Sequence, residues 1–321
     1  MPSAEDRKVT AAVQPRPEDY AYDLDRALQS VAGLRATMPS DAFTAETLGT
    51  ERAGHAVHIR EGGLFLTIGY LITEADQVWL HLADGSSVAA TPIGFDQATG
   101  FGLVQALGRV GLPVLPFGDS GAVELGDKVV IGGAGGPRRS VAARVVGKQE
   151  FAGYWEYVLD EAIFTAPAHP NWGGTALIGT DGTLLGIGSL QLEGSEGRDV
   201  NMFVPIDGLK PILDDMLSIG GRKGPPRPWL GMYVADADEK LVVMALANRG
   251  PAQRAKIESG DIVLAVNGTK AESLADLFRK IWAMGDAGVD VPLTVLRHER
   301  AIDVTVTSAD RNAFLKTPRV H

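Results

Sequence analysis

The chain of 321 residues contains no cysteine, and that absence removes several kinds of chemistry at once. Disulfide bonds, thiolate metal sites and cysteine nucleophiles are all excluded. Basic residues are also scarce relative to acidic ones, at 30 Lys and Arg against 40 Asp and Glu, which gives a formal charge of -10. A chain of this charge repels nucleic acids and anionic membrane surfaces at long range, so we expect neither as a partner.

Long hydrophobic runs are missing as well. No apolar stretch approaches the roughly 20 residues that a membrane-spanning helix requires. Residues 1–8 are polar and no apolar segment follows them, so no secretory signal is visible and the expected location is the cytoplasm. The remaining composition, 45% hydrophobic and 22% charged, is typical of a soluble globular chain with two or three domains.

Residues 1–30 form the first distinct segment. Residues 1–17 are polar and contain prolines, so no secondary structure is expected in them. Apolar residues then recur at helical spacing and predict a short amphipathic helix; they are Tyr20, Leu24, Ala27, Leu28 and Val31. This helix would either cover the end of a barrel or contact another copy of the chain.

Residues 31–219 are dominated by short strand-like runs separated by glycine-rich turns. The clearest runs are residues 64–72, 128–131, 141–146 and 183–190. Many short strands broken by Gly, Asp and Pro indicate an all-β barrel or sandwich rather than alternating strands and helices. Residues 220–228, rich in Gly, Pro and basic side chains, are typical of a linker between domains.

The second domain, residues 229–308, mixes strands with helices and precedes a C-terminal tail at 309–321. Strands are expected at 241–246, 261–266, 291–296 and 302–306. One helix should begin at Pro251, and a longer one should span 273–284, where apolar residues recur at spacings of three and four. Residues 257–268 (IESGDIVLAVNG), together with residues 229–232 (WLGM), closely resemble a bacterial PDZ domain.

The PDZ resemblance implies a site for a peptide or a protein C-terminus. Such domains bind an extended peptide as an added strand, and backbone N–H groups of the preceding loop hold its terminal carboxylate. The loop here is residues 229–232, and the groove should lie between residues 232–234 and the helix at 273–284. The predicted peptide-binding residues are Trp229, Leu230, Gly231, Met232, Tyr233, Val234, Leu274, Leu277, Phe278 and Ile281. About half of the apolar residues on the helix should instead belong to the domain core.

A PDZ domain behind a glycine-rich β domain resembles the domain order of the HtrA/Deg family of trypsin-like serine proteases. The implied fold is mostly β, a trypsin-like double β-barrel followed by an α+β PDZ domain. In this resemblance, residues 63–67 lead to the catalytic histidine, 94–99 to the catalytic aspartate, and 166–177 form the nucleophile loop. The residues at the histidine, aspartate and serine positions are then Tyr70, Gly100 and Trp172.

These replacements lead to the prediction of a proteolytically inactive HtrA-like protein. The triad requires an imidazole, a carboxylate that orients it and a hydroxyl nucleophile, and Tyr70, Gly100 and Trp172 supply none of them in these roles. Pro170 stands where the family's oxyanion hole takes a backbone N–H, which proline lacks. The predicted protein therefore has no catalytic residue, metal or cofactor, is not an enzyme, and acts as an adaptor, sensor or chaperone-like binder of peptides.

Three further features resemble sites but have structural interpretations. The Gly-Asp-Ser-Gly sequence around Ser120 occurs in digestive proteases, yet here it lies in what resembles the link between two barrels, where a turn is expected. His55 and His58 lie in a strand-like run at a spacing that points them to opposite faces, which disfavours a shared metal. His169 has no acidic or hydroxyl residue close to it in sequence, so a structural role is favoured.

Two alternative functions stay open. An active serine-type hydrolase would use other residues of the same cleft, for example Tyr70 with His169, or Ser189. A structural subunit would use the PDZ domain and the amphipathic helix to join protomers, and the family resemblance implies a homo-oligomer, often a trimer. The resemblance also implies a location in the cell envelope, in contrast to the cytoplasm expected from the missing signal.

Overall fold

Most of this chain is β-structure, arranged in two compact units. The computed structural model describes residues 8–194 and 197–316. The first unit contains the chain up to Gln149, residues Glu161–Lys223 and Lys316; the second contains Glu150–Asp160 and Gly224–Leu315. The prediction of a mostly β fold, with a double barrel followed by an α+β domain, is confirmed.

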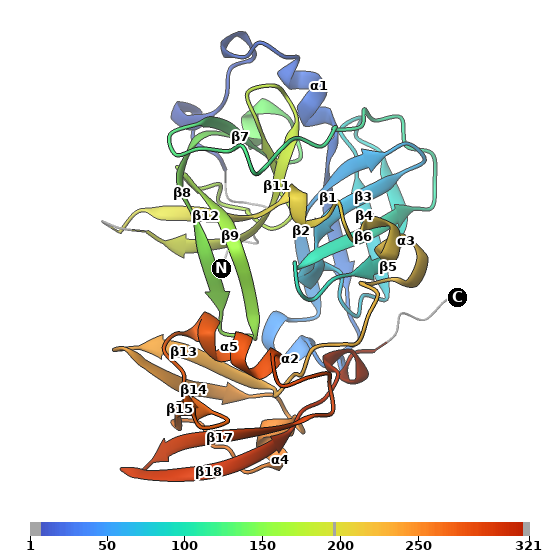
Figure 1. Cartoon of the computed structure of the whole chain (residues 1–321). Coiled ribbons are helices and arrows are strands. Elements are labelled where there is room, and N and C mark those ends of the chain that lie inside the picture. Colours follow the sequence, from blue (N-terminus) through green and yellow to red (C-terminus); the bar gives the residue numbers. More distant parts are fainter. Residues whose placement is uncertain (1–7, 195–196, 317–321) are drawn as a thin grey trace. The chain divides into compact units, whose positions relative to one another are not determined.

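Two closed β-barrels make up most of the first unit (Figure 1). The first barrel, blue to cyan, has the strand order β1-β2-β3-β6-β5-β4, and β1 pairs with both β2 and β4 to close it. Its strands are β1 (Val31–Thr37), β2 (Glu51–Arg60), β3 (Leu64–Ile68), β4 (Gln77–His81), β5 (Ser87–Phe95) and β6 (Phe101–Ala106). The second barrel, green to yellow, has the order β10-β11-β12-β9-β8-β7. Its strands are β7 (Lys128–Gly132), β8 (Val141–Gly153), β9 (Tyr157–Ala166), β10 (Ala176–Ile178), β11 (Leu184–Glu193) and β12 (Asp199–Pro205).

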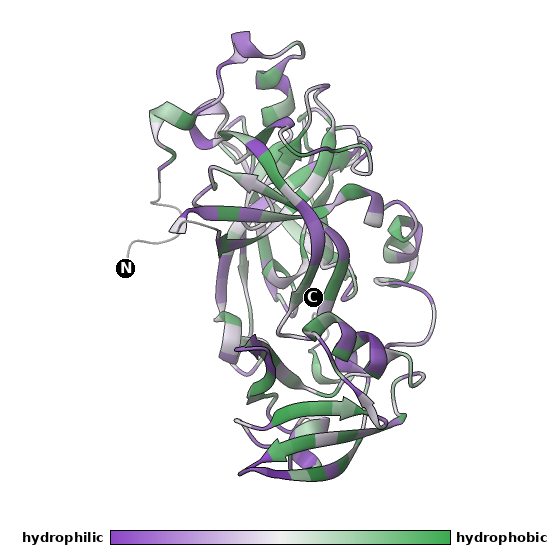
Figure 2. Ribbon diagram, turned by 60° about the vertical axis from the view of Figure 1, so that its left-hand side comes forward, coloured by the Kyte–Doolittle hydropathy of each residue, from purple (hydrophilic) through white to green (hydrophobic). Residues whose placement is uncertain are grey.

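Alternating apolar and polar residues explain why these segments form barrel strands. In β4, Val78 and Leu80 are buried and the three residues around them are exposed, as expected for a strand with one face toward the barrel interior. Phe101 in the first barrel and Phe203 in the second are fully buried. Figure 2 shows hydrophobic residues concentrated along the barrel strands. Each barrel therefore closes around an apolar interior of its own.

The run 64–72, predicted as one strand, is divided by the structure. After β3 the chain enters a 3-10 turn, η4 (Gly69–Leu71). The Gly69 N–H donates a hydrogen bond to the carbonyl oxygen of Gly100 at 2.7 Å, which fixes the start of this turn from a distant segment. An apolar pattern carries no information on such a long-range bond. As a result Tyr70 lies on a turn and not on a strand.

The predicted amphipathic helix is present but shorter than expected. Helix α1 spans Leu24–Gln29, and the side chain of Asp23 caps it by accepting a backbone N–H. Tyr20 lies before this helix, and Val31 already belongs to β1. Residues 1–7 of the expected irregular tail lie outside the described residues. The rest of that tail contains two 3-10 turns, η2 (Ala11–Val13) and η3 (Pro17–Asp19).

The second unit contains a six-stranded antiparallel sheet with the order β13-β14-β15-β17-β18, in which β16 pairs with β15. Strand β13 lies at its edge, and α5, whose N-terminus is capped by the Ser273 side chain, packs against β13 and β15. The strands are β13 (Met232–Ala237), β14 (Lys240–Leu246), β15 (Ile262–Val266), β16 (Thr269–Lys270), β17 (Asp290–Arg297) and β18 (Arg300–Thr307). The other helices in the part of the chain that the structure describes are α2 (Ala45–Leu48), α3 (Leu213–Ile219), α4 (Pro251–Arg254), α5 (Leu274–Trp282), η5 (Pro137–Arg139), η7 (Ile206–Gly208) and η8 (Arg311–Phe314). Among the helices of the described residues, none is long and apolar enough to cross a membrane.

The largest difference between these units and the predicted boundaries lies within the barrel domain, and smaller ones lie in the linker at 220–228 and the tail at 309–321. Residues Glu150–Asp160, which we call the tip segment, join β8 to β9 and were assigned with the rest of 31–219 to the barrel domain. They belong instead to the second unit. Val158 of the tip segment is part of that unit's hydrophobic core, which explains why the segment groups with it.

Candidate functional site

Three distant segments meet at the positions that resemble the catalytic cleft. The Tyr70 hydroxyl, on η4, donates a hydrogen bond to the Ser189 carbonyl oxygen on β11 at 2.9 Å. The Trp172 side chain hydrogen-bonds to the same tyrosine. Gly69, next to Tyr70, is bonded through its N–H to Gly100. The structure therefore brings together Tyr70, Gly100 and Trp172, the three residues that the resemblance assigns to the triad positions.

The chemistry of Tyr70 is set by its burial. Burial raises the pKa of the Tyr70 hydroxyl above its ordinary value of 10.0, and the hydrogen bond from Trp172 opposes this shift. The hydroxyl therefore stays protonated at neutral pH and serves as a hydrogen-bond donor, not as a general base. Gly100 has φ of +84° and contributes only its backbone.

Two histidines hold the loop that precedes Trp172. The His55 ring accepts a hydrogen bond from the Ala134 N–H at Nδ1 and donates from Nε2 to the Asn171 carbonyl oxygen, each at 3.1 Å. The His169 ring accepts from the Asn171 N–H at Nδ1 at 3.1 Å and donates from Nε2 to the Arg139 carbonyl oxygen at 2.7 Å. Because each Nδ1 must accept, both rings are neutral and in one tautomer. Burial lowers the pKa of both, that of His55 to about 3.

The loop after Trp172 has no room for side chains. A Cβ on Gly174, whose φ is +76°, would lie 1.9 Å from the His55 carbonyl oxygen. A Cβ on Gly173 would lie 2.7 Å from the Tyr70 hydroxyl oxygen, and the Gly173 carbonyl oxygen accepts the His55 N–H at 2.8 Å. Glycine is therefore required at both positions, because the backbone or a side chain of the first barrel lies too close for any larger residue.

The residues of the alternative hydrolase are brought together only in part. Both ring nitrogens of His169 bond to neighbouring backbone groups, so the pairing of Tyr70 with His169 is not formed. Ser189 is buried beside Tyr70. Ser120 lies in a turn, where its hydroxyl donates to Asp207 Oδ2 at 2.7 Å. Across the described residues no three His, Cys, Asp or Glu side chains gather as a metal-binding group.

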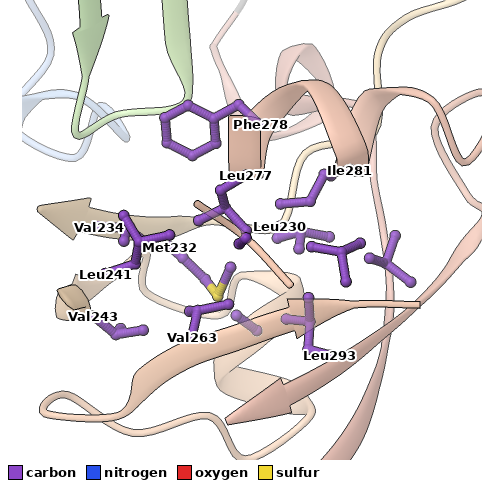
Figure 3. Close-up of a cluster of buried hydrophobic side chains, with 14 of the residues drawn as sticks. Leu230, Met232, Val234, Leu241, Val243, Val263, Leu277, Phe278, Ile281 and Leu293 are labelled. Atoms are coloured by element: carbon purple, nitrogen blue, oxygen red, sulfur yellow. The ribbon is translucent and has the colours of Figure 1, made fainter. Parts of the chain in front are cut away.

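In the second unit most of the predicted groove residues are buried in one hydrophobic cluster, part of which Figure 3 shows. These residues are Leu230, Met232, Val234, Leu274, Leu277, Phe278 and Ile281. Leu277 points toward the strands of the sheet, whereas Phe278 lies on the side of the hairpin formed by β8 and β9. Trp229 is buried outside this cluster, and Tyr233 is partly exposed. About half of the apolar residues on the helix were expected in the domain core. All four of the predicted groove residues on α5 are buried in it.

A residue that sequence analysis did not single out contacts the loop at residues 229–232. Glu156, in the tip segment, accepts hydrogen bonds at Oε1 from the backbone N–H groups of Leu230 at 3.1 Å, Gly231 at 2.7 Å and Met232 at 3.2 Å. It is 6% exposed. Burial raises the pKa of its carboxyl to about 7, although the three N–H groups and Arg311 act in the opposite direction.

The sequence did contain one signal for this segment. Four of the seven residues in 151–157 (FAGYWEY) are aromatic, against 7% in the whole chain. Such a density on a turn between two strands indicates a packed tip and not a solvent-exposed one. The glutamate at its centre could have been singled out on that ground, but its partners are more than 70 residues away in the sequence.

Comparisons with known proteins agree with this architecture. Residues 54–187 match the family of trypsin-like peptidase domains, and residues 228–307 match the family of PDZ domains. Among curated proteins, the chain is 26% identical to a probable periplasmic serine endoprotease DegP-like of Chlamydia muridarum, over 78% of this chain and 52% of that protein. It is 29% identical to a probable periplasmic serine protease do/HhoA-like of Haemophilus influenzae, over 75% of this chain and 54% of that protein. It is 23% identical to the serine protease Do-like HtrA of Bacillus subtilis, over 87% of this chain and 70% of that protein.

Solved structures share the fold. The HtrA-type protease AlgW with a decapeptide superposes with a TM-score of 0.53 at 20% identity, over 92% of this chain and 98% of that one. A serine endoprotease from Yersinia pestis superposes with a TM-score of 0.52 at 22% identity, over 89% and 95%. The fold and the two matched families define a trypsin-like protease domain joined to a PDZ domain. The chain belongs to the HtrA/DegP type of this domain combination, and it spans about half the length of the DegP-like and do/HhoA-like relatives named above.

Three predictions are wrong on these findings. The relatives are named serine proteases or endoproteases, which overturns the prediction of a proteolytically inactive protein that is not an enzyme. Several are named periplasmic, which overturns the expected cytoplasmic location. The prediction of inactivity equated the loss of the standard side chains with the loss of the activity. The prediction of a cytoplasmic location relied on the polar character of residues 1–8 alone.

Proposed function

We propose that this chain is a serine-type endopeptidase of the cell envelope that recognises polypeptides through its PDZ domain. The two halves of the proposal have different support. Two of the relatives named above are described as a probable periplasmic serine endoprotease and a probable periplasmic serine protease, and they support the activity and the location. The geometry of the loop at residues 229–232 supports the recognition of a carboxylate.

The observation that carries the recognition is the set of convergent N–H groups. Leu230, Gly231 and Met232 direct their backbone N–H groups at one carboxylate oxygen, at 2.7 to 3.2 Å. The following strand, β13, is at the edge of its sheet. A loop with convergent N–H groups followed by an edge strand is the arrangement that receives a C-terminal peptide as an added strand.

The catalytic half places hydrolysis on a serine hydroxyl of the cleft. Tyr70, Gly100 and Trp172 at the triad positions supply no nucleophile and no base, and Pro170 supplies no oxyanion N–H. Ser189 is the serine that adjoins Tyr70. Because the raised pKa of Tyr70 keeps this residue protonated, hydrolysis proceeds without a strong general base, and we expect it to be slow.

The test is cleavage of casein and of a fluorogenic peptide library by the purified chain. Slow cleavage that is lost in Ser189→Ala and kept in Ser120→Ala supports the proposal, because Ser120 is a buried serine of a turn and serves as the matched control. Absence of cleavage across the neutral and alkaline range overturns the catalytic half, and so does cleavage that survives in Ser189→Ala.

Recognition is measured separately by calorimetry on the full chain. Decapeptides with a free C-terminal carboxylate are compared with the same peptides carrying a C-terminal amide. Binding that requires the carboxylate supports the proposal, and equal binding of both forms, or none, contradicts it. The family resemblance also leads us to propose that the chain forms a homo-oligomer, a trimer. Light scattering on the chain with and without residues 1–30 tests that prediction.

A further inference from the structure

The tip segment occupies the place where a ligand of the PDZ domain would lie. Val158 is buried in the same hydrophobic cluster as Phe278 of α5, and Ala152 packs against that cluster. Tyr154 and Tyr233 of β13 make an edge-on ring contact at 6.1 Å between centroids. The segment therefore packs against α5 and β13, the two elements that border a peptide groove in this domain type.

The carboxylate of Glu156 makes the contacts of a peptide terminus. Its Oε1 receives the three N–H groups of the loop, and its Oε2 also lies 3.2 Å from the Leu230 nitrogen. A terminal α-carboxylate uses this kind of loop in the same way. Together these hydrogen bonds hold the tip segment on the loop, so a competing carboxylate must replace them.

The backbone before Glu156 makes the contact of an added strand. The Tyr154 carbonyl oxygen accepts the Val234 N–H at 3.0 Å, on the strand edge that no other strand of the sheet covers. Tyr154 precedes Glu156 by two residues, while Val234 follows Met232 by two, so the tip runs antiparallel to β13. A peptide bound antiparallel to β13, with its C-terminus in the loop, would make the same two contacts: a backbone hydrogen bond to the strand and a carboxylate in the loop.

Two ion pairs attach the ends of the tip segment to α5. Arg279 pairs with Glu150 at 2.5 Å and with Asp160 at 2.6 Å, and these residues are the first and the last of the segment. All three side chains are at least 44% exposed, so each pair contributes little and the segment is fastened weakly at its base. At its centre, Glu156 has φ of +61°, a backbone conformation that is unfavourable for a residue with a side chain. The contacts of its carboxylate offset this cost in the docked state.

We propose that the tip segment is an internal ligand of the PDZ groove, and that a polypeptide C-terminus binds this protein by displacing Glu156 from the loop. The proposal rests on the peptide recognition proposed above. It predicts that the intact chain binds peptides more weakly than a chain with an open groove, since the apparent affinity scales with the fraction of molecules in which the groove is open.

The experiment uses the full chain and two alanine variants. Glu156→Ala removes the internal carboxylate, and Glu239→Ala is the matched control, because Glu239 is an exposed glutamate of the same unit with a similar φ of +59°. The probe is a fluorescein-labelled decapeptide with an apolar last residue and a free carboxylate, followed by anisotropy. Amide hydrogen exchange of residues 229–234 is measured on the same samples without peptide, and circular dichroism verifies folding.

We expect Glu156→Ala to bind the peptide about tenfold or more tightly than the unmodified chain, and to exchange the amides of 229–234 faster. Glu239→Ala should change neither quantity. If both quantities are unchanged in Glu156→Ala, the tip segment is not the occupant and the inference is wrong. If exchange becomes faster but no peptide binds, the internal ligand is supported and the proposed peptide recognition fails.

A second variant covers the case in which Glu156→Ala does not fold. Arg279→Gln removes both ion pairs at the base of the tip segment without touching the loop. It should raise peptide affinity in the same direction by a smaller factor, together with faster exchange at 229–234. An affinity and an exchange rate equal to those of the unmodified chain contradict the proposal.

Discussion

Two loops of this protein are held by side chains from distant parts of the chain, and they are held by opposite chemistry. In the loop at 169–174, the backbone of Asn171 is bonded to two histidine rings that burial keeps neutral. In the loop at 229–232, three N–H groups are bonded to Glu156, whose pKa lies near 7. The two histidines do not change their ionisation at physiological pH, whereas the Glu156 carboxyl is near the midpoint of its titration.

The difference also concerns what can replace each partner. A peptide end carries no imidazole, and the loop at 169–174 is in addition packed at Gly174 against backbone. A peptide end does carry a carboxylate, which is the group that Glu156 presents. The comparison agrees with a first loop that is a fixed part of the barrel cleft, and with our proposal that the occupant of the second loop is exchangeable.

The largest effect is expected where the first loop is packed most closely. Gly174→Ala should lower the free energy of unfolding by about 3 kcal/mol or more, because the new methyl group would collide with the His55 carbonyl oxygen in addition to the strain of a positive φ. Gly85→Ala, at φ of +86° with no atom within 4 Å, should cost only about 1 kcal/mol. Urea unfolding measures both, and equal losses would contradict the packing argument.

The neutral histidines predict a dependence of stability on acid. The pKa of His55 is about 3 in the folded protein, against an ordinary 6.5, so the unfolded chain binds more protons between these values. The contribution of His55 to stability is therefore constant well above pH 6.5 and falls below it, by about 1.4 kcal/mol per pH unit. Urea unfolding between pH 7 and 5 measures the slope. His55→Gln should reduce it, and an unchanged slope would show that other groups are responsible.

The second loop should show a titration that the first does not. The pKa of Glu156 is about 7 when docked, against an ordinary 4.5, and Arg311 is the charged group that opposes this shift. Protonation therefore favours docking below pH 4.5, and this contribution is lost as the pH rises to 7. The NMR shift of the Gly231 amide should titrate with a midpoint near 7. A midpoint near 4.5, or persistence of the titration in Glu156→Ala, would contradict the assignment.

The smallest effect is expected at the tyrosine of the cleft. Tyr70→Phe removes one hydrogen bond to the Ser189 carbonyl oxygen and should lower the free energy of unfolding by about 1 kcal/mol. Tyr154→Phe is the control, since Tyr154 is 55% exposed and its ring stays in place. Thermal unfolding compares the two, and a neutral Tyr70→Phe would show that this bond contributes nothing.

Much of the fold was predictable because it depends on local patterns. Alternation of apolar and polar residues predicted the barrel strands, and Pro251 and the Ser273 cap agree with the starts of α4 and α5. Errors occurred where tertiary bonds override a pattern. The bond from Gly69 to Gly100 ends β3 early. The late start of α1, after Tyr20, has instead a local cause, the cap by Asp23. The site was predictable only as a set of positions, because a pattern does not say which side chain accepts from which N–H.

The sequence by itself determined the domain order, the β-rich class and the identities of the residues in the cleft, since periodicity and short motifs report on neighbours along the chain. Only the tertiary structure decided that His55 and His169 stay neutral and that Glu156 lies on the PDZ loop. These outcomes depend on burial and on hydrogen bonds across 30 to 116 positions of sequence. Such contacts exist only once the strands have closed and the tip segment has packed, because an unfolded chain leaves the same groups solvated.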